Sequence, residues 1–567
     1  MASATAPRTE SIARFILFAP PFLVGLFLRL YGLSGQILLD DEWHSLNFVL
    51  DKSFLALLTT HGLGANCIPQ NIVNWILLHA GGWSELALYL PSVLCGIAGL
   101  MIFPRLVSRL AGRTVAFFFS VLFAISPCLI FYSRIVRPSS MVVFFGFLSL
   151  LCLALWTREG RPRQLRAYAV CGFAAIYFHP YAALPVLAPL AGLFLAADSR
   201  RPGLAEATWI SRKKIGRTGF LIVALLAIFL GPAHWRNPWW LQELARDRVS
   251  AQGLWEFLSL LAGTRLALSK LLFASLIGGG LVLWIRREFR VGLLFLSVGI
   301  AFALLLIFAT QDGIHTGILI ARFNILVLPV SMLLAAAALD RILARLPVAG
   351  RLAAGLPLIC GLAAGSPLWR TFDLPNNFMH HSAFQDSYAP FDWSTSRLRA
   401  LAALPQMPRE RIPAFYSALA RDPSVPGIVE FPMYMGDSLN FHYYYQHFHR
   451  KPVAVGYVAG LSFPPLPSKN GFIYQALPVD YVFSRARSLG LLGKLHFANL
   501  IPLTEADGLS RAHRGWWIVL HRDLLWETSG DQGPFNFHPP IQLERELTAR
   551  FGAPVFADDQ IQAWRIP

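Results

Sequence analysis

Long apolar stretches separated by short polar loops dominate the first part of this 567-residue chain. A helix that crosses a bilayer needs about 20 mostly apolar residues, and eleven stretches approach that length. They are 12–33, 84–104, 114–131, 138–156, 165–178, 181–197, 217–235, 266–285, 291–310, 318–340 and 351–368. The pattern predicts a polytopic α-helical membrane domain over residues 1–369.

Residues 44–82, between the first two predicted spans, are too polar and too interrupted to cross a membrane. We expect HSLNFVLDKSFLALLTTH and PQNIVNWILLHAGG to form two amphipathic helices on the membrane surface. Counting the second one as a span would invert the charge pattern of every later loop. Both helices are therefore predicted to lie at the outer face.

Basic residues gather in alternate loops, which is typical of loops that stay in the cytoplasm. These clusters are Arg105, Arg109 and Arg113; Arg158, Arg161, Arg163 and Arg166; Arg200, Arg201, Arg212, Lys213, Lys214 and Arg217; Arg286, Arg287 and Arg290; and Arg341, Arg345 and Arg351. The rule predicts a cytoplasmic N-terminus. It places 37–45, 134–138 and everything after the last span outside.

The composition changes after the last span, and residues 370–567 are predicted to form a soluble, extracytoplasmic α/β domain. The β-like runs are GIVEFPMY, PVAVGYVAG, VDYVFSRA and GWWIVLH, and the candidate helices are 394–404, 437–447 and 541–551. His442, His447 and His449 lack an acid at ligand spacing. We expect them on the surface or in an acceptor groove rather than around a metal.

Several function classes find no support in the composition. The net charge is +17, but the basic residues form scattered loop clusters rather than a nucleic-acid patch. Five of the six cysteines lie in apolar runs, so no disulfide framework is indicated. The triplet GGG at 278–280 is expected to serve close helix packing rather than phosphate binding. No Walker or dinucleotide fingerprint is present.

Three consecutive acids, Asp40, Asp41 and Glu42, follow the first predicted span. One acid at a membrane boundary is usually a solvated helix end, and that alternative stays open for this loop. Three acids concentrate more negative charge than a helix end requires. An enzyme that takes a proton from a sugar hydroxyl outside the membrane needs such a carboxylate.

Four cationic or titratable side chains lie on the same predicted outer face: Arg134 and Arg137 in YSRIVRP, His179 in FHPY and Arg322 in ILIARF. A guanidinium suits phosphate because its planar fork donates two hydrogen bonds. The alternatives are arginines that snorkel to lipid headgroups and a histidine that only caps a helix.

The order of these features resembles the GT-C superfamily of membrane glycosyltransferases, including the protein O-mannosyltransferases and the lipid A aminoarabinose transferase. The resemblance is carried by the DE pair after the first span, the surface helices, SELALYLPSVLCGIAGLMIFPRLVSRLAGR, SPCLIFYSRIVRPSSM and ILIARFNILVLPV. It implies transfer of a sugar from a polyprenyl-phosphate carrier, with Asp41 at the position of the family's acidic pair. Arg137, Arg322 and His179 also match family positions.

We therefore predict a GT-C-type hexosyl- or pentosyltransferase in a bacterial cytoplasmic membrane. Asp41 is the expected base, with Glu42 and Asp40 as supporting acids. Arg137, Arg322 and Arg134 are expected to bind the donor phosphate, and His179 to bind substrate. The expected partners are a polyprenyl-phosphate-sugar donor, a glycan, lipid or protein acceptor and the bilayer, with no nucleic acid. No cofactor is assigned, and the need for a divalent metal is left open.

The alternative class is a polytopic lipid or solute transporter. Transporters usually show repeated halves and charged or broken helices near the bilayer midplane. In this sequence the unusual charges collect at one predicted face instead. The enzyme is the preferred interpretation.

Overall fold

The computed structural model places two compact units: unit 1 comprises Met1–Leu33, Ser53–Val73 and Leu86–Arg370, and unit 2 comprises Ser34–Lys52, Asn74–Glu85 and Thr371–Pro567. The residues whose structure is described are 6–31, 33, 49, 53–60, 67–80, 85–197, 211–236, 249–264, 266–308, 317–364, 366, 413–431, 449, 451, 453–454, 514–522 and 540–567.

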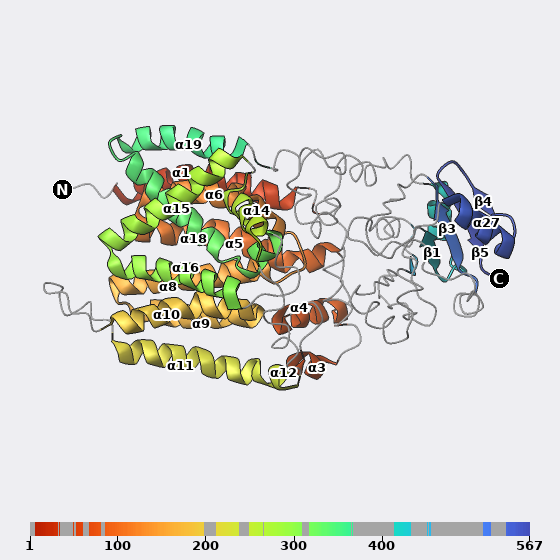
Figure 1. The fold of residues 1–567 in the computed structure, drawn as a ribbon, viewed down its shortest axis with the longest axis horizontal. Helices are drawn as coiled ribbons and strands as arrows, with labels where there is room; N and C mark the ends of the chain where they lie inside the picture. The colour runs from red at the N-terminus through yellow and green to blue at the C-terminus, as the bar shows by residue number, and fades with distance from the viewer. Residues whose placement is uncertain are drawn as a thin grey trace. The chain divides into compact units, whose positions relative to one another are not determined.

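Most described residues before 370 form helices that run side by side in unit 1 (Figure 1). They are α1 (Ala6–Leu30), α3 (Phe54–Thr59), α4 (Ile68–His79, which continues into unit 2), α5 (Glu85–Ala111), α6 (Arg113–Ile125), α7 (Pro127–Tyr132), α8 (Ser139–Glu159), α9 (Pro162–Phe178), η2 (Pro180–Ala182), α10 (Ala183–Ala196), α11 (Arg212–Phe229), α12 (Gly231–Arg236), α14 (Ala251–Ala262), α15 (Ala267–Arg287), α16 (Phe289–Phe308), α17 (Gly317–Phe323), α18 (Val327–Ile342) and α19 (Val348–Ala364).

Each predicted span coincides with one of these helices or with a consecutive pair. Within the described residues, four helices are long and apolar enough to cross a membrane: Leu86–Ala111, Ser139–Glu159, Ala267–Arg287 and Phe289–Phe308. A bent pair, Gly317–Phe323 with Val327–Ile342, adds a fifth if it counts as one span. Several apolar helices are thus confirmed, and the count of eleven stays a prediction.

Three predicted spans divide between two α-helices: 217–235 at Leu230, and two others near predicted site arginines. The stretch 114–131 divides at Ser126, whose hydroxyl accepts a hydrogen bond from the Leu129 amide (3.5 Å) and caps α7. The stretch 318–340 divides between α17 and α18, which are bent by 91°. At this break the Asn324 side-chain amide donates to the Ile320 carbonyl (3.1 Å). The short helix α7 ends two residues before Arg134, and the short helix α17 carries Arg322.

The surface-helix stretch contributes α3 and the start of α4 to unit 1. Ile68 of α4 is buried with Leu230 and Ala233, at the end of α11 and in α12. Leu58 of α3 and Tyr177 of α9 pack against the same cluster. These contacts hold α3 and the start of α4 against the end of α9 that precedes His179.

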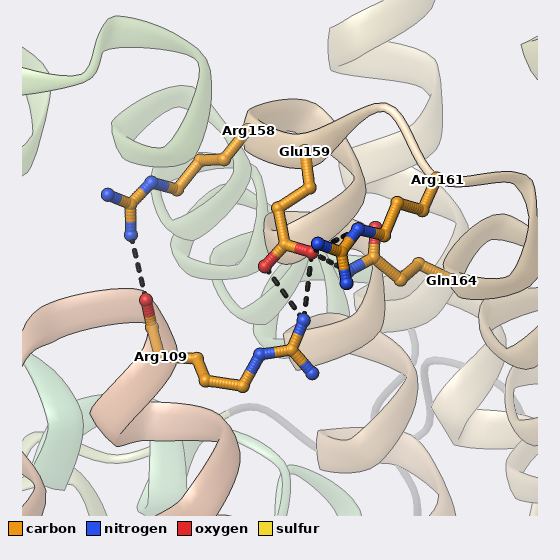
Figure 2. A network of polar contacts seen from close by, with 5 residues as sticks. All are labelled: Arg109, Arg158, Glu159, Arg161 and Gln164. Atoms are coloured by element: carbon orange, nitrogen blue, oxygen red, sulfur yellow. Dashed lines mark hydrogen bonds and ion pairs between the residues drawn. The ribbon is translucent and has the colours of Figure 1, made fainter. Parts of the chain in front are cut away.

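Basic loops from different parts of the chain meet at one end of the bundle (Figure 2). Arg109 Nη2 lies 2.8 Å from both carboxylate oxygens of Glu159, and Arg161 and Gln164 contact the same carboxylate. Arg158 pairs with Glu288 at 3.1 Å, which brings in the loop between α15 and α16. Three of the five loops grouped by the charge pattern therefore lie together.

One glycine of the GGG triplet, Gly280, serves the close packing that the sequence predicted. A Cβ on Gly280 would lie 2.0 Å from the carbonyl oxygen of Leu334, so the backbones of α15 and α18 touch at this point. Only glycine allows so close an approach without moving one helix.

Unit 2 contains a five-stranded sheet in the order β2-β1-β3-β5-β4. The strands are β1 (Ile428–Phe431), β2 (Val453–Ala454), β3 (Trp517–His521), β4 (Phe556–Ala557) and β5 (Ile561–Arg565), accompanied by α23 (Ala414–Arg421) and α27 (Pro540–Phe551). β1 is parallel to β2 and β3, whereas β5 is antiparallel to β3 and β4. The predicted strand VDYVFSRA and the predicted helices 394–404 and 437–447 lie outside the described residues.

A buried polar cluster lies beside this sheet. The Tyr416 hydroxyl donates to Glu430 Oε1 and lies 2.9 Å from His521 Nε2, and all three residues have 0% exposure. His449, also fully buried, stacks on Tyr416 and accepts the Lys451 amide on Nδ1 at 3.0 Å. The expectation of a surface position is wrong for His449, while His442 and His447 lie outside the described residues.

Acidification is expected to destabilise this sheet. Burial lowers the pKa of His449 from 6.5 to about 4; the charge of Glu430 opposes this shift, and those of Lys451 and His521 add to it. Between pH 6.5 and 4 the unfolded chain takes up a proton that the folded unit does not, so stability falls with pH by on the order of 3 kcal/mol. Hydrogen exchange of the β1 and β3 amides in the full chain, corrected for intrinsic rates, measures the stability of the sheet at each pH. Equal pH dependence in His449→Gln would contradict the assignment.

Candidate functional site

The site is built around the turn between α7 and α8, where Arg137 is 1% exposed. The Arg137 carbonyl accepts a hydrogen bond from Ser92 Oγ of α5 (3.2 Å), and Ser140 Oγ donates to the Ser92 carbonyl (2.7 Å). Pro138 then fixes the entry into α8. This burial differs from that of an arginine that snorkels to solvent, and phosphate binding by Arg137 stays a prediction.

His179 ends α9 and is 8% exposed. Its Nδ1 accepts the Tyr181 amide at 3.3 Å. Burial, reinforced by the positive charges of Arg322 and Arg137, lowers the pKa of His179 to about 3. The ring is therefore neutral at pH 7, and its proton lies on Nε2, which is left as a hydrogen-bond donor.

Arg322 reaches the same place from α17. Its guanidinium carbon lies 5.9 Å from the ring centroid of Phe323. The Phe323 ring in turn lies 6.0 Å from His179 and 4.7 Å from Tyr181. The structure thus brings together three of the predicted residues, Arg137, His179 and Arg322, although they are far apart in the sequence.

Hydrogen bonds of neighbouring residues connect the helices that carry or precede these site residues. The Tyr132 hydroxyl of α7 donates to the Ile318 carbonyl of α17 (3.4 Å). The Gly317 amide, which begins α17, donates to Glu256 Oε2 of α14 (3.2 Å). Cys67, just before α4, is buried, and its environment includes the charge of Arg137. The two arginine-bearing segments and the surface helix are therefore neighbours.

Arg134 has a different setting from Arg137. It is 5% exposed, and its Nη1 donates to the carbonyl of Leu28 near the end of α1 (3.0 Å). This contact links Arg134 to the helix that leads toward the acidic stretch. Asp40, Asp41 and Glu42 themselves lie outside the described residues, so their roles stay predictions.

Sequence reasoning missed Arg29. It has 0% exposure, lies 5.5 Å from the Phe123 ring and donates to carbonyls of Gly25 (3.0 Å), Ala124 (3.4 Å) and Phe123 (3.4 Å). A Cβ on Gly96 would lie 3.1 Å from Arg29 Nε, so a glycine makes room for it. A basic residue at the predicted outer end of the first span, against the charge rule, was the available signal.

Comparison with solved structures identifies the fold. ArnT from Cupriavidus metallidurans in the apo state covers 98% of both chains at 13% identity with a TM-score of 0.53. The same protein bound to undecaprenyl phosphate covers 99% of both at 13% identity with a TM-score of 0.54. The chain therefore has the fold of ArnT, and the resemblance predicted from the sequence is confirmed.

The family match is more specific but shorter. Residues 71–235, which contain Arg134, Arg137 and His179, match the family described as "Dolichyl-phosphate-mannose-protein mannosyltransferase". The match to the archaeal oligosaccharyltransferase AglB from Archaeoglobus fulgidus covers 91% of this chain and 70% of the AglB chain at 11% identity. Its TM-score of 0.44 is too low to show a shared fold. No curated protein sequence matches the chain.

Proposed function

We propose that the chain moves a sugar from a polyprenyl-phosphate-linked donor to an acceptor hydroxyl on the outer side of a bacterial cytoplasmic membrane. The convergence of Arg137, His179 and Arg322 carries the proposal. The same fold occurs in ArnT, which was crystallised with undecaprenyl phosphate. The proposed topology has eleven spans, with residues 370–567 outside the cytoplasm.

The proposed chemistry assigns each group one task. Asp41 removes the proton from the acceptor hydroxyl as its oxygen attacks the anomeric carbon. The bond between that carbon and the phosphate oxygen breaks, and polyprenyl phosphate leaves with the electron pair. Arg137 and Arg322 stabilise the charge that grows on the phosphate. The neutral His179 donates a hydrogen bond from Nε2 to a phosphate or sugar oxygen.

The test is release of polyprenyl phosphate from synthetic short-chain polyprenyl-phosphate hexoses and pentoses. Purified protein is incubated with this panel and a cell-envelope extract as acceptor, and the lipid product is measured by mass spectrometry. We expect release with at least one sugar, and release slower by roughly a hundredfold or more when Arg322→Ala replaces the wild type. A transporter would instead redistribute the intact lipid between the leaflets of a vesicle without cleaving it, which would contradict the proposal.

A further inference from the structure

A long apolar groove of about 660 Å³ lies between α15, α18 and α19, away from the arginines and histidine of the candidate site. Its lining is apolar except for Ser269, Ser275 and Arg341. The groove is open toward the surroundings of the bundle, since Leu272 on one wall and Leu358 on another are 51% and 53% exposed.

The groove exists because α15 and α18 touch at one point and small residues follow it. Gly280 packs directly on the Leu334 backbone. Next to this crossing, Gly279 lines the groove, and the nearest atom to its Cβ position is the Ala338 Cβ at 3.9 Å. Pro357 and Ile359 of α19 complete the wall. Neither glycine nor alanine has a side chain long enough to fill the space.

An apolar groove that opens into a bilayer is filled by a lipid tail, because water gains no polar partners there and an empty void loses dispersion contacts. The groove follows α15 from Ser269 to Leu283, about 21 Å at 1.5 Å per residue. One leaflet of the hydrocarbon core is roughly 15 Å thick. A single acyl chain therefore fits along the groove.

The charge at one end identifies the headgroup. Arg341 lines the groove and is exposed, and no ion pair ties it to the described residues. Arg351 of α19 is by contrast paired with Asp340 of α18 at 2.9 Å. Arg286 and Arg287 end α15 and add positive charge to the end of that helix. A guanidinium at a lipid interface favours a phosphate with net negative charge.

This headgroup is not the donor phosphate. α18 begins close to Arg322 and ends at Ile342, and its 16 residues span about 24 Å. Arg341 therefore lies at the opposite end of α18 from the candidate site. We propose that the groove is a binding site for one anionic glycerophospholipid, with its phosphate at Arg341 and an acyl chain between α15, α18 and α19.

Native mass spectrometry of delipidated full-length protein, titrated with phosphatidylglycerol or phosphatidylcholine, tests the proposal. We expect one phosphatidylglycerol to bind more tightly than phosphatidylcholine. Arg341→Ala should weaken phosphatidylglycerol binding by about tenfold, the loss of one charge-assisted contact. Arg345→Ala, an exposed arginine that does not line the groove, is the matched control and should bind as the wild type does.

Gly279→Leu should fill the groove and prevent binding of either lipid, and Ser275→Leu replaces it if the first variant does not fold. Unchanged phosphatidylglycerol binding in Arg341→Ala would overturn the headgroup assignment. Unchanged binding in the groove-filling variant would overturn the site. Retention of polyprenyl phosphate instead of phospholipid, lost on filling the groove, would show that the donor's own tail occupies it and would also overturn the proposal.

Discussion

Replacing Asp41 by Asn is expected to lower sugar transfer by roughly a hundred- to ten-thousand-fold, because a positioned general base contributes about that much to the rate. The amide keeps the size of the side chain but cannot accept the proton. A solvated loop acid would cost almost nothing at this position. The measurement is steady-state transfer from a synthetic lipid-linked sugar, corrected for folded protein.

The control for this variant is Asp51→Asn, another acid in the stretch between the first two spans, which should keep normal transfer. Near-normal transfer in Asp41→Asn would move the base to Glu42 or Asp40. Near-normal transfer in all three single variants would remove the acidic stretch from the mechanism.

Arg137→Ala and Arg322→Ala are each expected to lower turnover by roughly a hundredfold or more, the usual effect of losing one donor to a developing negative charge. Donor affinity should fall less than turnover, since charge on the phosphate grows toward the transition state. Lysine should rescue only in part, because an ammonium lacks the bidentate fork. Separate measurement of turnover and of donor binding in detergent decides the point.

Interfacial snorkelling makes the opposite prediction for these two arginines. Lysine would then replace either of them fully, and the alanine variants would lower protein yield and leave turnover intact. Arg166→Ala, at the basic end of the bundle, is a matched control that should leave turnover unchanged. Full activity in both lysine variants would eliminate the phosphate clamp.

The positions of the helices were predictable because the length of each apolar stretch and the charge of each loop can be read from the sequence alone. Arg109, Arg158 and Glu288 meet at one end of the bundle, as the charge pattern required. The break before α18 was not predictable, because neither proline nor glycine occurs between Phe323 and Val327. It is stabilised by local bonds such as that of the Asn324 side chain, and these depend on the folded backbone.

The site was predictable in part for a similar reason. Arg137 and Arg322 were expected at one depth because each lies near the outer end of a predicted span, and the structure places both beside His179. Arg29 was missed because its burial depends on the space at Gly96 of another helix. In unit 2, β5 was missed because this five-residue segment is held as a strand by hydrogen bonds to β3, which begins more than forty residues earlier.

The bond between Tyr132 and the Ile318 carbonyl joins the helix before Arg137 to the helix that carries Arg322. Glu256 of α14 holds the first residue of α17 as well, so α7, α14 and α17 are joined by bonds that do not involve α18. We therefore expect the spacing of the two arginine-bearing segments to depend more on these bonds than on the tilt of α18, which changes in membranes of different thickness.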